Sequence, residues 1–308
     1  MNPNAATEAP APSHPASKAA ERRPGAFIDG EWRSAPDAET FTVTEPATDS
    51  ELARVEASGT SEVDAAVAGA KARFADDWRW RSPRERGALM RQVAARIREH
   101  VDELAELEAR EVGKPKRDAQ KFDISYTHAA WDYFGGLADT LHGELLDQGP
   151  IEARVVLEPY GVVAAILPFN WPPIHFSKKC APAVAAGNTV VIKPGEQAPL
   201  TVMRLVELAN EVLPPGVINA VSGVDAGAQL SGHRDITRIT FTGATATGRK
   251  VLKSAAENLT FATMELGGKN ALLVLEDADM DVAVDVALEG MYYNQGEACT
   301  STARILVH

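Results

Sequence analysis

Residues 161–196 read GVVAAILPFNWPPIHFSKKCAPAVAAGNTVVIKPGE, and this stretch decides the fold of the 308-residue chain. Two short apolar runs rich in β-branched residues, Val162–Leu167 and Val190–Ile192, flank a segment near residues 172–186 that has helical character. A strand, a helix and a second strand at this spacing predict two parallel strands joined by a crossover helix.

The same alternation continues toward the C-terminus. Further strands are predicted at Val217–Val221, Thr237–Phe241 and Ala271–Leu275, and further helices near residues 199–212, 225–232 and 244–256. We therefore expect an α/β fold with a doubly wound, Rossmann-like parallel sheet over roughly residues 155–265, followed by the start of a second α/β unit. Such sheets bind ligands at the carboxyl ends of their strands.

The N-terminal part is predicted to be mainly helical. Asp29-Gly30 between apolar residues indicates a hairpin over Phe27–Trp32. One helix is predicted at residues 61–75 with Ser61 as its cap, and Ser82-Pro83 opens a long helix that ends near Gly113. A third helix is predicted at roughly residues 117–140.

Composition and charge exclude several classes of protein. The net charge of −12 argues against nucleic acid or an anionic membrane surface as a partner. No apolar run approaches the length of about 18 residues that a membrane span needs. Two cysteines provide no disulfide framework, which favours a reducing, cytoplasmic location. Residues 1–26 are rich in Ala, Pro, Ser and Glu and are expected to form a disordered tail.

Two residues near the C-terminus supply parts for covalent carbonyl chemistry. Cys299 follows a bend that contains Gly296, and Glu265 precedes the pair Gly267-Gly268. A thiolate attacks a carbonyl carbon, and a carboxylate takes a proton from the water that releases the product. A lone cysteine is more commonly a small buried hydrophobe, so Cys299 by itself leaves both readings open. No histidine or cysteine spacing indicates a metal site.

Two predicted strands end in motifs suited to a nucleotide. The turn from Gly243 to Gly248 opens a helix whose free amides attract phosphate, although the fingerprint G-x-G-x-x-G is absent and an ordinary turn is the alternative. Lys193 lies where it can reach ribose or phosphate oxygens. Glu196 can accept a ribose 2′-hydroxyl and would repel a 2′-phosphate, which favours NAD over NADP. A solvated surface ion pair is the alternative for Lys193 and Glu196.

A third strand is followed by Asn170, whose side-chain amide can donate to a developing oxyanion or simply shape a Pro-flanked turn. These motifs, with Glu265 and Cys299 in this order, resemble the NAD(P)-dependent aldehyde dehydrogenase superfamily. The resemblance runs from about Phe27 to His308 and includes the landmarks EPAT at residues 45–48 and EVGKP at residues 111–115.

The resemblance implies a role for each catalytic candidate. Cys299 would be the nucleophile, and Glu265 the general base. Asn170 and the Cys299 backbone N–H would form the oxyanion hole, and Lys179 matches a lysine that the family places near the active site. A small-molecule aldehyde would add to Cys299 as a thiohemiacetal, lose hydride to NAD and leave as a carboxylic acid after Glu265 activates water.

The resemblance also implies the cofactor site and the domain organisation. Lys193 and Glu196 would hold the adenosine ribose, and the remaining cofactor contacts would be Gly243, Ala244, Gly248 and Leu266. Ala244 stands where many relatives have Ser, so one hydroxyl contact to phosphate is missing. Residues 27–265 would form the NAD-binding domain, with a bridging or oligomerisation arm near residues 143–158, and residues 266–308 the beginning of the catalytic domain. The full-length protein would be a homo-oligomer.

Three other readings stay open. An acylating relative would pass the thioester to coenzyme A, although the presence of Glu265 favours hydrolysis. A cysteine hydrolase would need a partnered histidine, which no sequence feature indicates. The third reading is an inactive fragment with only cofactor binding or an interaction role. The apolar run Arg304–Val307 predicts a strand at which the sequence stops, so we expect a C-terminally truncated chain that is inactive and poorly stable alone.

Overall fold

Strand β8 (Val162–Ile166) lies inside the main sheet, between β11 and β9, in the computed structural model, which describes residues 22–34 and 37–308. The sheet has seven strands in the order β12-β11-β8-β9-β10-β2-β3. Its parallel part consists of β8, β9 (Thr189–Lys193), β10 (Ile218–Val221), β11 (Arg238–Gly243) and β12 (Phe261–Leu266). The predicted parallel α/β sheet is therefore confirmed.

Helices cover both faces of this sheet because both faces of its central strands are apolar. Val163 and Ala165 of β8 join a buried cluster with residues of α2 (Pro83–Glu99), α5 (Ser125–Leu137), α6 (Pro172–Ala185) and α7 (Leu200–Asn210). Val162 and Ala164 point to the opposite face, where α1 (Thr60–Asp76), α8 (Val224–Gly232) and α9 (Thr245–Ala256) pack. Every residue of β8 and β9 is buried, as expected for parallel strands between two helical layers.

The predicted hairpin is also present. Strands β2 (Ala26–Ile28) and β3 (Glu31–Arg33) pair antiparallel at the edge of the sheet beside β10. Asp29 and Gly30 both have positive φ, 53° and 86°, which is the backbone geometry that an Asp-Gly turn favours.

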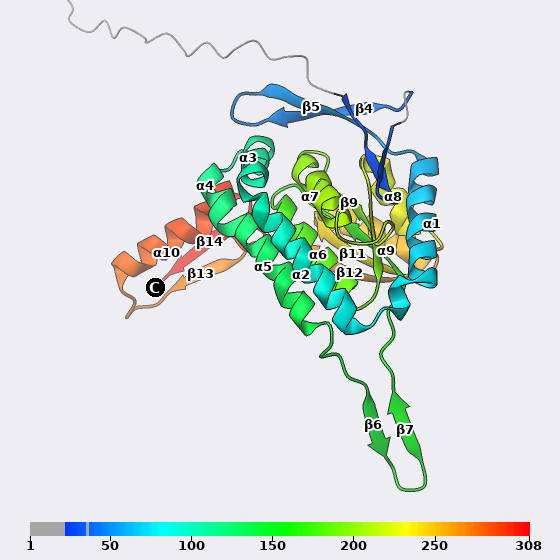
Figure 1. Cartoon of the computed structure of the whole chain (residues 1–308). Coiled ribbons are helices and arrows are strands. Elements are labelled where there is room, and N and C mark those ends of the chain that lie inside the picture. Colours follow the sequence, from blue (N-terminus) through cyan, green and yellow to red (C-terminus); the bar gives the residue numbers. More distant parts are fainter. Residues whose placement is uncertain (1–21, 35–36) are drawn as a thin grey trace, which may run out of the picture.

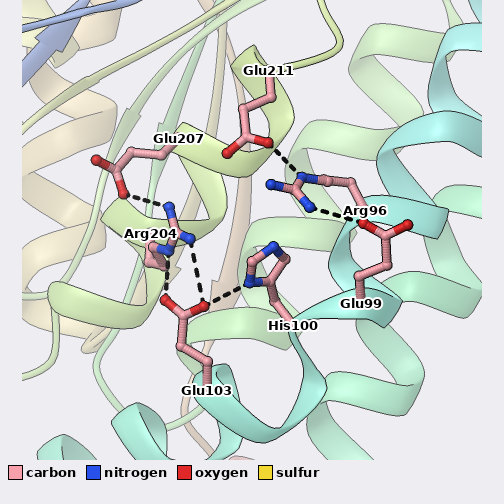
Figure 2. A network of polar contacts seen from close by, with 7 residues as sticks. All are labelled: Arg96, Glu99, His100, Glu103, Arg204, Glu207 and Glu211. Atoms are coloured by element: carbon pink, nitrogen blue, oxygen red, sulfur yellow. Dashed lines mark hydrogen bonds and ion pairs between the residues drawn. The ribbon is translucent and has the colours of Figure 1, made fainter.

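The long helix predicted from Ser82 to Gly113 is wrong in one respect: it is two helices, α2 (Pro83–Glu99) and α3 (Val101–Val112). His100 leaves helical geometry at the junction, with φ −110° and ψ 18°, and its ring lies 2.6 Å from a Glu103 carboxylate oxygen. Figure 2 shows that Glu103 also accepts from Arg204 of α7, at 2.7 Å. The bend thus turns the start of α3 toward α7.

Two other helix details differ from the prediction. The cap of α1 is Gly59, not Ser61, and the Gly59 N–H is bound by the Glu62 carboxylate at 2.8 Å. The third predicted helix is interrupted, with α4 (Lys116–Asp118), a π-helix η2 (Ala119–Ile124) and α5 (Ser125–Leu137) in succession.

Smaller elements surround the main sheet (Figure 1). β1 (Arg22–Arg23), β4 (Thr40–Glu45) and β5 (Ser50–Glu56) form a three-stranded sheet, and η1 (Trp78–Trp80) is a short 3-10 turn. The hairpin of β6 (Glu144–Asp147) and β7 (Glu152–Val155) projects from the body. β13 (Ala271–Val274), α10 (Met280–Tyr292), η3 (Tyr293–Gly296) and β14 (Arg304–Val307) form a separate unit, in which β13 and β14 pair parallel.

The predicted tail of residues 1–26 lies outside the described residues as far as residue 21. From there, Arg22–Arg23 belong to β1, and Ala26 is buried in β2. No helix among the described residues is long and apolar enough to cross a membrane.

Strand β12 was not predicted. It pairs with β11 along its whole length and carries Glu265 at its carboxyl end, opposite Thr242. Its residues are exposed or half-buried because it lies at the edge of the sheet, so its sequence FATMEL lacks the continuous apolar run of the central strands.

Trp131 tests the packing of the helical layer. Its ring is fully buried on α5 and stacks on Phe176 of α6 at 5.7 Å between centroids. Trp131→Ala should lower the free energy of unfolding by about 3–5 kcal/mol, because the cavity cannot collapse between two helices. Tyr133→Ala on the same helix, where Tyr133 is 63% exposed, is the control and should cost no more than about 1 kcal/mol. Equal losses in urea denaturation would contradict this account.

Candidate active site

The site lies where the winding of the sheet reverses. From β8 the chain proceeds through β9 to β10 on one side, and then returns to place β11 and β12 on the other side. The loops that follow β8 and β11 therefore leave in opposite directions and open a crevice at the carboxyl edge of the sheet. Asn170 follows β8, Ala244 follows β11, and Glu265 is the penultimate residue of β12 at the same edge.

The N-terminus of α9 is built to let an anion approach. Ala244 is the N-cap in extended geometry, and no side chain there bonds to the amides of the first turn. A Cβ on Gly243 would lie 2.6 Å from the Phe241 ring, and one on Gly248 would lie 2.8 Å from Leu266 Cδ2. Both positions must therefore be glycine for α9 to pack this closely on β11 and β12. The free N–H groups and the helix dipole fit a pyrophosphate.

Lys193, the last residue of β9, forms an ion pair with Glu196 in the loop that follows. Lys193 is buried and Glu196 is partly exposed beside a cleft of about 580 Å³, which the start of α8 at residues 223–225 also lines. A Cβ on Gly195 would lie 2.9 Å from the backbone N of Phe169, so this loop packs directly on the loop that carries Asn170.

Cys299 is exposed, and the bend that precedes it has an unusual backbone. Asn294, Gln295 and Gly296 all have positive φ, at 53°, 48° and 81°. The Asn294 side chain donates to the backbone oxygen of Asn170 at 2.9 Å, and Asn170 Nδ2 donates to the Glu297 carbonyl at 2.6 Å. These two bonds hold Asn170 against the Cys299 loop, two residues from the thiol.

A second asparagine ties the thiol loop to the end of β12. Asn270 Nδ2 donates to the carbonyl of Cys299 at 2.9 Å and to that of Ser301 at 3.3 Å. Asn270 lies in the turn between Glu265 and β13, so three sequence-predicted residues, Asn170, Glu265 and Cys299, come from segments that converge here. The side-chain amide of Asn170 is not free to donate to an oxyanion in this structure, because it donates to the backbone carbonyl of Glu297.

Lys179 is buried on α6, and its ammonium donates to Thr240 Oγ1 of β11 at 2.9 Å. Burial lowers the pKa of Lys179 from 10.5 to about 8, while attraction to the Glu265 carboxylate opposes that shift. The neighbouring Cys180 is fully buried, and burial raises the pKa of its thiol well above the usual value. Cys299 is thus the exposed thiol and Cys180 the inert one.

The sequence did not identify the residues that hold this arrangement. Asn294 and Gln295 precede Gly296 in the Cys299 run, and Asn tolerates left-handed backbone in turns that contain Gly. Asn270 and Thr240 had no comparable signal, because each acts through a partner distant in sequence.

Comparison with known proteins identifies the family. The profile of the Aldehyde dehydrogenase family matches residues 32–308. The chain belongs to this family. It is 42% identical to the aldehyde dehydrogenase citD of Monascus ruber over 285 residues, which are 92% of this chain and 56% of that protein. It is 41% identical to an aminoacetaldehyde dehydrogenase of Pseudomonas aeruginosa, with 92% of this chain and 58% of that protein covered.

Solved aldehyde dehydrogenase structures have the same fold. PnpE in complex with nicotinamide adenine dinucleotide superposes with a TM-score of 0.90 at 41% identity, over 93% of this chain and 59% of PnpE. The NAD+ complex of the Bacillus cereus aldehyde dehydrogenase gives 0.89 at 38% identity, over 93% and 59%. The chain thus spans between 56% and 59% of the length of these relatives. In the described part of this aldehyde dehydrogenase chain, no group of three or more His, Cys, Asp or Glu side chains is arranged to hold a metal ion.

The lowered pKa of Lys179 has a consequence for stability. Between pH 8 and 10.5 the unfolded chain binds more protons at this lysine than the folded chain, so its contribution to stability rises with pH across that range. Lys179→Met should therefore raise the free energy of unfolding near pH 7, by about 2–3 kcal/mol, and the gain should shrink as the pH approaches 10.5. Lys178→Met, at the exposed neighbour, should show no such pH dependence in denaturant titrations. A gain independent of pH would contradict the burial account.

Proposed function

We propose that the protein to which this chain belongs oxidises an aldehyde to a carboxylic acid with NAD, through a thiohemiacetal and a thioester on Cys299. The observation that carries the proposal is the reciprocal hydrogen bonding of Asn170 with Asn294 and Glu297, which holds a predicted oxyanion donor two residues from an exposed thiol. Family membership and the NAD complexes of related structures support the same chemistry.

In the proposed mechanism, the Cys299 thiolate attacks the carbonyl carbon, and negative charge moves to the carbonyl oxygen. Asn170 Nδ2 and the Cys299 N–H stabilise this oxyanion, once Asn170 exchanges the Glu297 carbonyl for it. NAD, when bound, would supply the acceptor for the hydride of the former aldehyde carbon. Loss of this hydride converts the thiohemiacetal on Cys299 into a thioester. Glu265 then takes a proton from water, which attacks the thioester and frees the thiolate. Lys179, buried behind β11, adds positive potential near Glu265.

The cofactor contacts are also proposals. The pyrophosphate would lie at the amides after Gly243 and Ala244, where no side chain competes. Gly248 and Leu266 pack α9 on β12 beside that position. Lys193 and Glu196 would bind the adenosine ribose in place of their mutual ion pair, and the Glu196 carboxylate would disfavour NADP.

A specific observation favours the second candidate, a fragment that binds cofactor without turning over aldehyde. Within residues 266–308, all of them described, Val274 is the single buried side chain. The proposed nucleophile thus lies in a segment held mainly by polar contacts, whereas the proposed cofactor crevice rests on the fully buried strands β8 and β9. Aldehyde-dependent NADH formation separates the two candidates.

Assembly and location remain proposals as well. The β6–β7 hairpin exposes Leu145 and Val155 on an arm that projects from the body (Figure 1), which suits pairing between copies of the full-length protein. Two unpaired thiols suit a reducing cytoplasmic location.

Substitutions in the site separate the chemical steps. Cys299→Ala should abolish NADH formation and the covalent adduct with an aldehyde, while Cys180→Ala leaves both unchanged. Asn170→Ala should slow adduct formation by about 10²–10³-fold, because one oxyanion donor is lost.

Glu265→Gln should keep the first burst of NADH and slow later turnovers, because Glu265 acts after hydride transfer in the proposed mechanism. Stopped-flow NADH absorbance and intact mass spectrometry measure these steps, and turnover by the Cys299 variant would exclude the mechanism.

Cofactor choice depends on one charge. The unmodified chain should bind NAD more tightly than NADP, and Glu196→Gln should bring the two affinities closer by removing repulsion of the 2′-phosphate. Calorimetric titration with both cofactors gives the ratio. Glu257→Gln, at an exposed carboxylate just after α9, is the control and should leave the ratio unchanged. Equal affinity of the unmodified chain for both cofactors would refute the role of Glu196.

A further inference from the structure

A pocket of about 550 Å³ lies between α3 and α7, and β1, β3 and β5 complete its wall. The two helices run antiparallel beside it. Arg204 of α7 donates to Glu103 near the start of α3, at 2.7 Å. Glu111, near the end of α3, accepts from the backbone N–H of Leu200 at the start of α7, also at 2.7 Å. None of the described residues that line the pocket belongs to the candidate active site, so the pocket is a separate feature of the fold.

Apolar side chains form the floor of this pocket. Val55, Leu200 and Met203 are buried. Leu107 packs against the small hydrophobic cluster to which Val55 and Leu200 belong. Trp32, which is 37% exposed, adds an aromatic ring to the lining. Such a floor favours the binding of a hydrophobic body, because apolar surface on both sides is removed from water.

The carboxylates of the lining are already paired. Figure 2 shows the Arg204 guanidinium between Glu103 and Glu207, to which it donates at 2.7 Å and 3.0 Å. Glu106 pairs with Lys116 at 3.2 Å. A dissolved cation would therefore find no unpaired carboxylate among the described lining residues.

Two guanidinium groups of the lining have hydrogen-bond donors to spare. The Arg23 side chain makes no hydrogen bond or ion pair within the described part of the chain. Arg110 reaches Glu45 only at 3.3 Å and 3.5 Å, and 47% of its side chain is exposed. Burial raises the pKa of Glu111 to about 7, while hydrogen bonds at the start of α7 and then the charge of Arg23 oppose this rise. Arg23 therefore lies near the end of α3 that carries Arg110.

The balance of charge favours a ligand with a single negative charge. Three arginines and three glutamates stand among the described lining residues, so their formal charges cancel. A phosphate ester would bring a second charge close to the glutamates and would lose more hydration on entry. A carboxylate carries one charge, and its two oxygens match the fork of a guanidinium group.

We propose that this pocket binds the anion of a small carboxylic acid that has an aromatic or branched body. The carboxylate accepts hydrogen bonds from Arg23 and Arg110, and the body lies on the apolar floor beside Trp32. A charge-assisted hydrogen bond of this kind is about twice as strong as a neutral one. The inference does not rest on the proposed function, because the lining residues take no part in the proposed reaction.

The binding test needs no catalysis. Calorimetric titration of the purified 308-residue chain compares 4-phenylbutyrate with 4-phenylbutanamide, its neutral isostere, and with a phosphate ester of the same body. The carboxylate should bind at least about fivefold more tightly than the amide, because only the carboxylate forms charge-assisted bonds with guanidinium groups. The phosphate ester should bind more weakly than the carboxylate. Equal or tighter binding of the amide or of the phosphate ester, or no measurable binding of the carboxylate, would overturn the proposal.

Variants locate the two ends of the ligand. Arg23→Gln and Arg110→Gln should each weaken the carboxylate about three- to tenfold and leave the amide unchanged. Leu107→Trp, which fills part of the floor, should weaken both ligands. Arg98→Gln, at an exposed arginine of α2 outside the lining, is the matched control and should change neither. Thermal melting checks that each variant folds. Carboxylate affinity that stays unchanged in both the Arg23 and the Arg110 variants would overturn the proposal.

Two further variants separate this pocket from the candidate active site. Trp32 is the one tryptophan among the described lining residues, so saturating carboxylate should change the fluorescence of the unmodified chain and of Trp80→Phe, but not that of Trp32→Phe. Cys299→Ala should leave the titrations unchanged. Loss of carboxylate binding in the Cys299 variant, or an undiminished fluorescence change in Trp32→Phe, would place the acid elsewhere and overturn the proposal.

Discussion

The parallel pairing of β8 with β9 on one side and β11 on the other is the constraint on which the site depends. Because β8 is apolar on both faces, helices must cover both, and the chain can add strands on either side of it. The switch from β10 back to β11 then places the loop of Asn170 beside the start of α9. A polar side chain at any position of β8 would disturb the helical layer that it faces and, with it, the spacing between the Asn170 loop and the start of α9.

The thiol loop shows how local strain is offset by contacts elsewhere. Asn294 and Gln295 adopt left-handed backbone, which costs about 1–2 kcal/mol for each such residue. The Asn294 bond to Asn170 and the Asn270 bond to Cys299 fix the loop against the two flanking segments. The backbone that carries Cys299 is thereby fixed, while its thiol stays exposed to solvent.

Much of this structure was predictable because its determinants are local. The strands and helices between residues 161 and 256 agree with the prediction, since strand apolarity and helical periodicity alternate cleanly there. The edge strand β12 lacks that signal, and the break at His100 accompanies contacts of Glu103 with His100 and with the distant Arg204, which a local pattern does not reveal. In the site, Cys299 and Glu265 stand in recognisable motifs. Asn270 and Thr240 could not be found, because an amide or hydroxyl has no role until tertiary structure supplies its partner.

The uneven burial of the chain sets two different lifetimes for its backbone hydrogen bonds. Opening the α10–β13–β14 unit exposes little apolar surface beyond Val274, so its amides should exchange with solvent through local fluctuations. The amides of β8 and β9 can exchange only when the helical layers separate. A protease would therefore cut first within the segment around Cys299 and leave the strands β8 and β9 intact. The segment that carries Cys299 should therefore fluctuate on a shorter timescale than the buried strands of the main sheet.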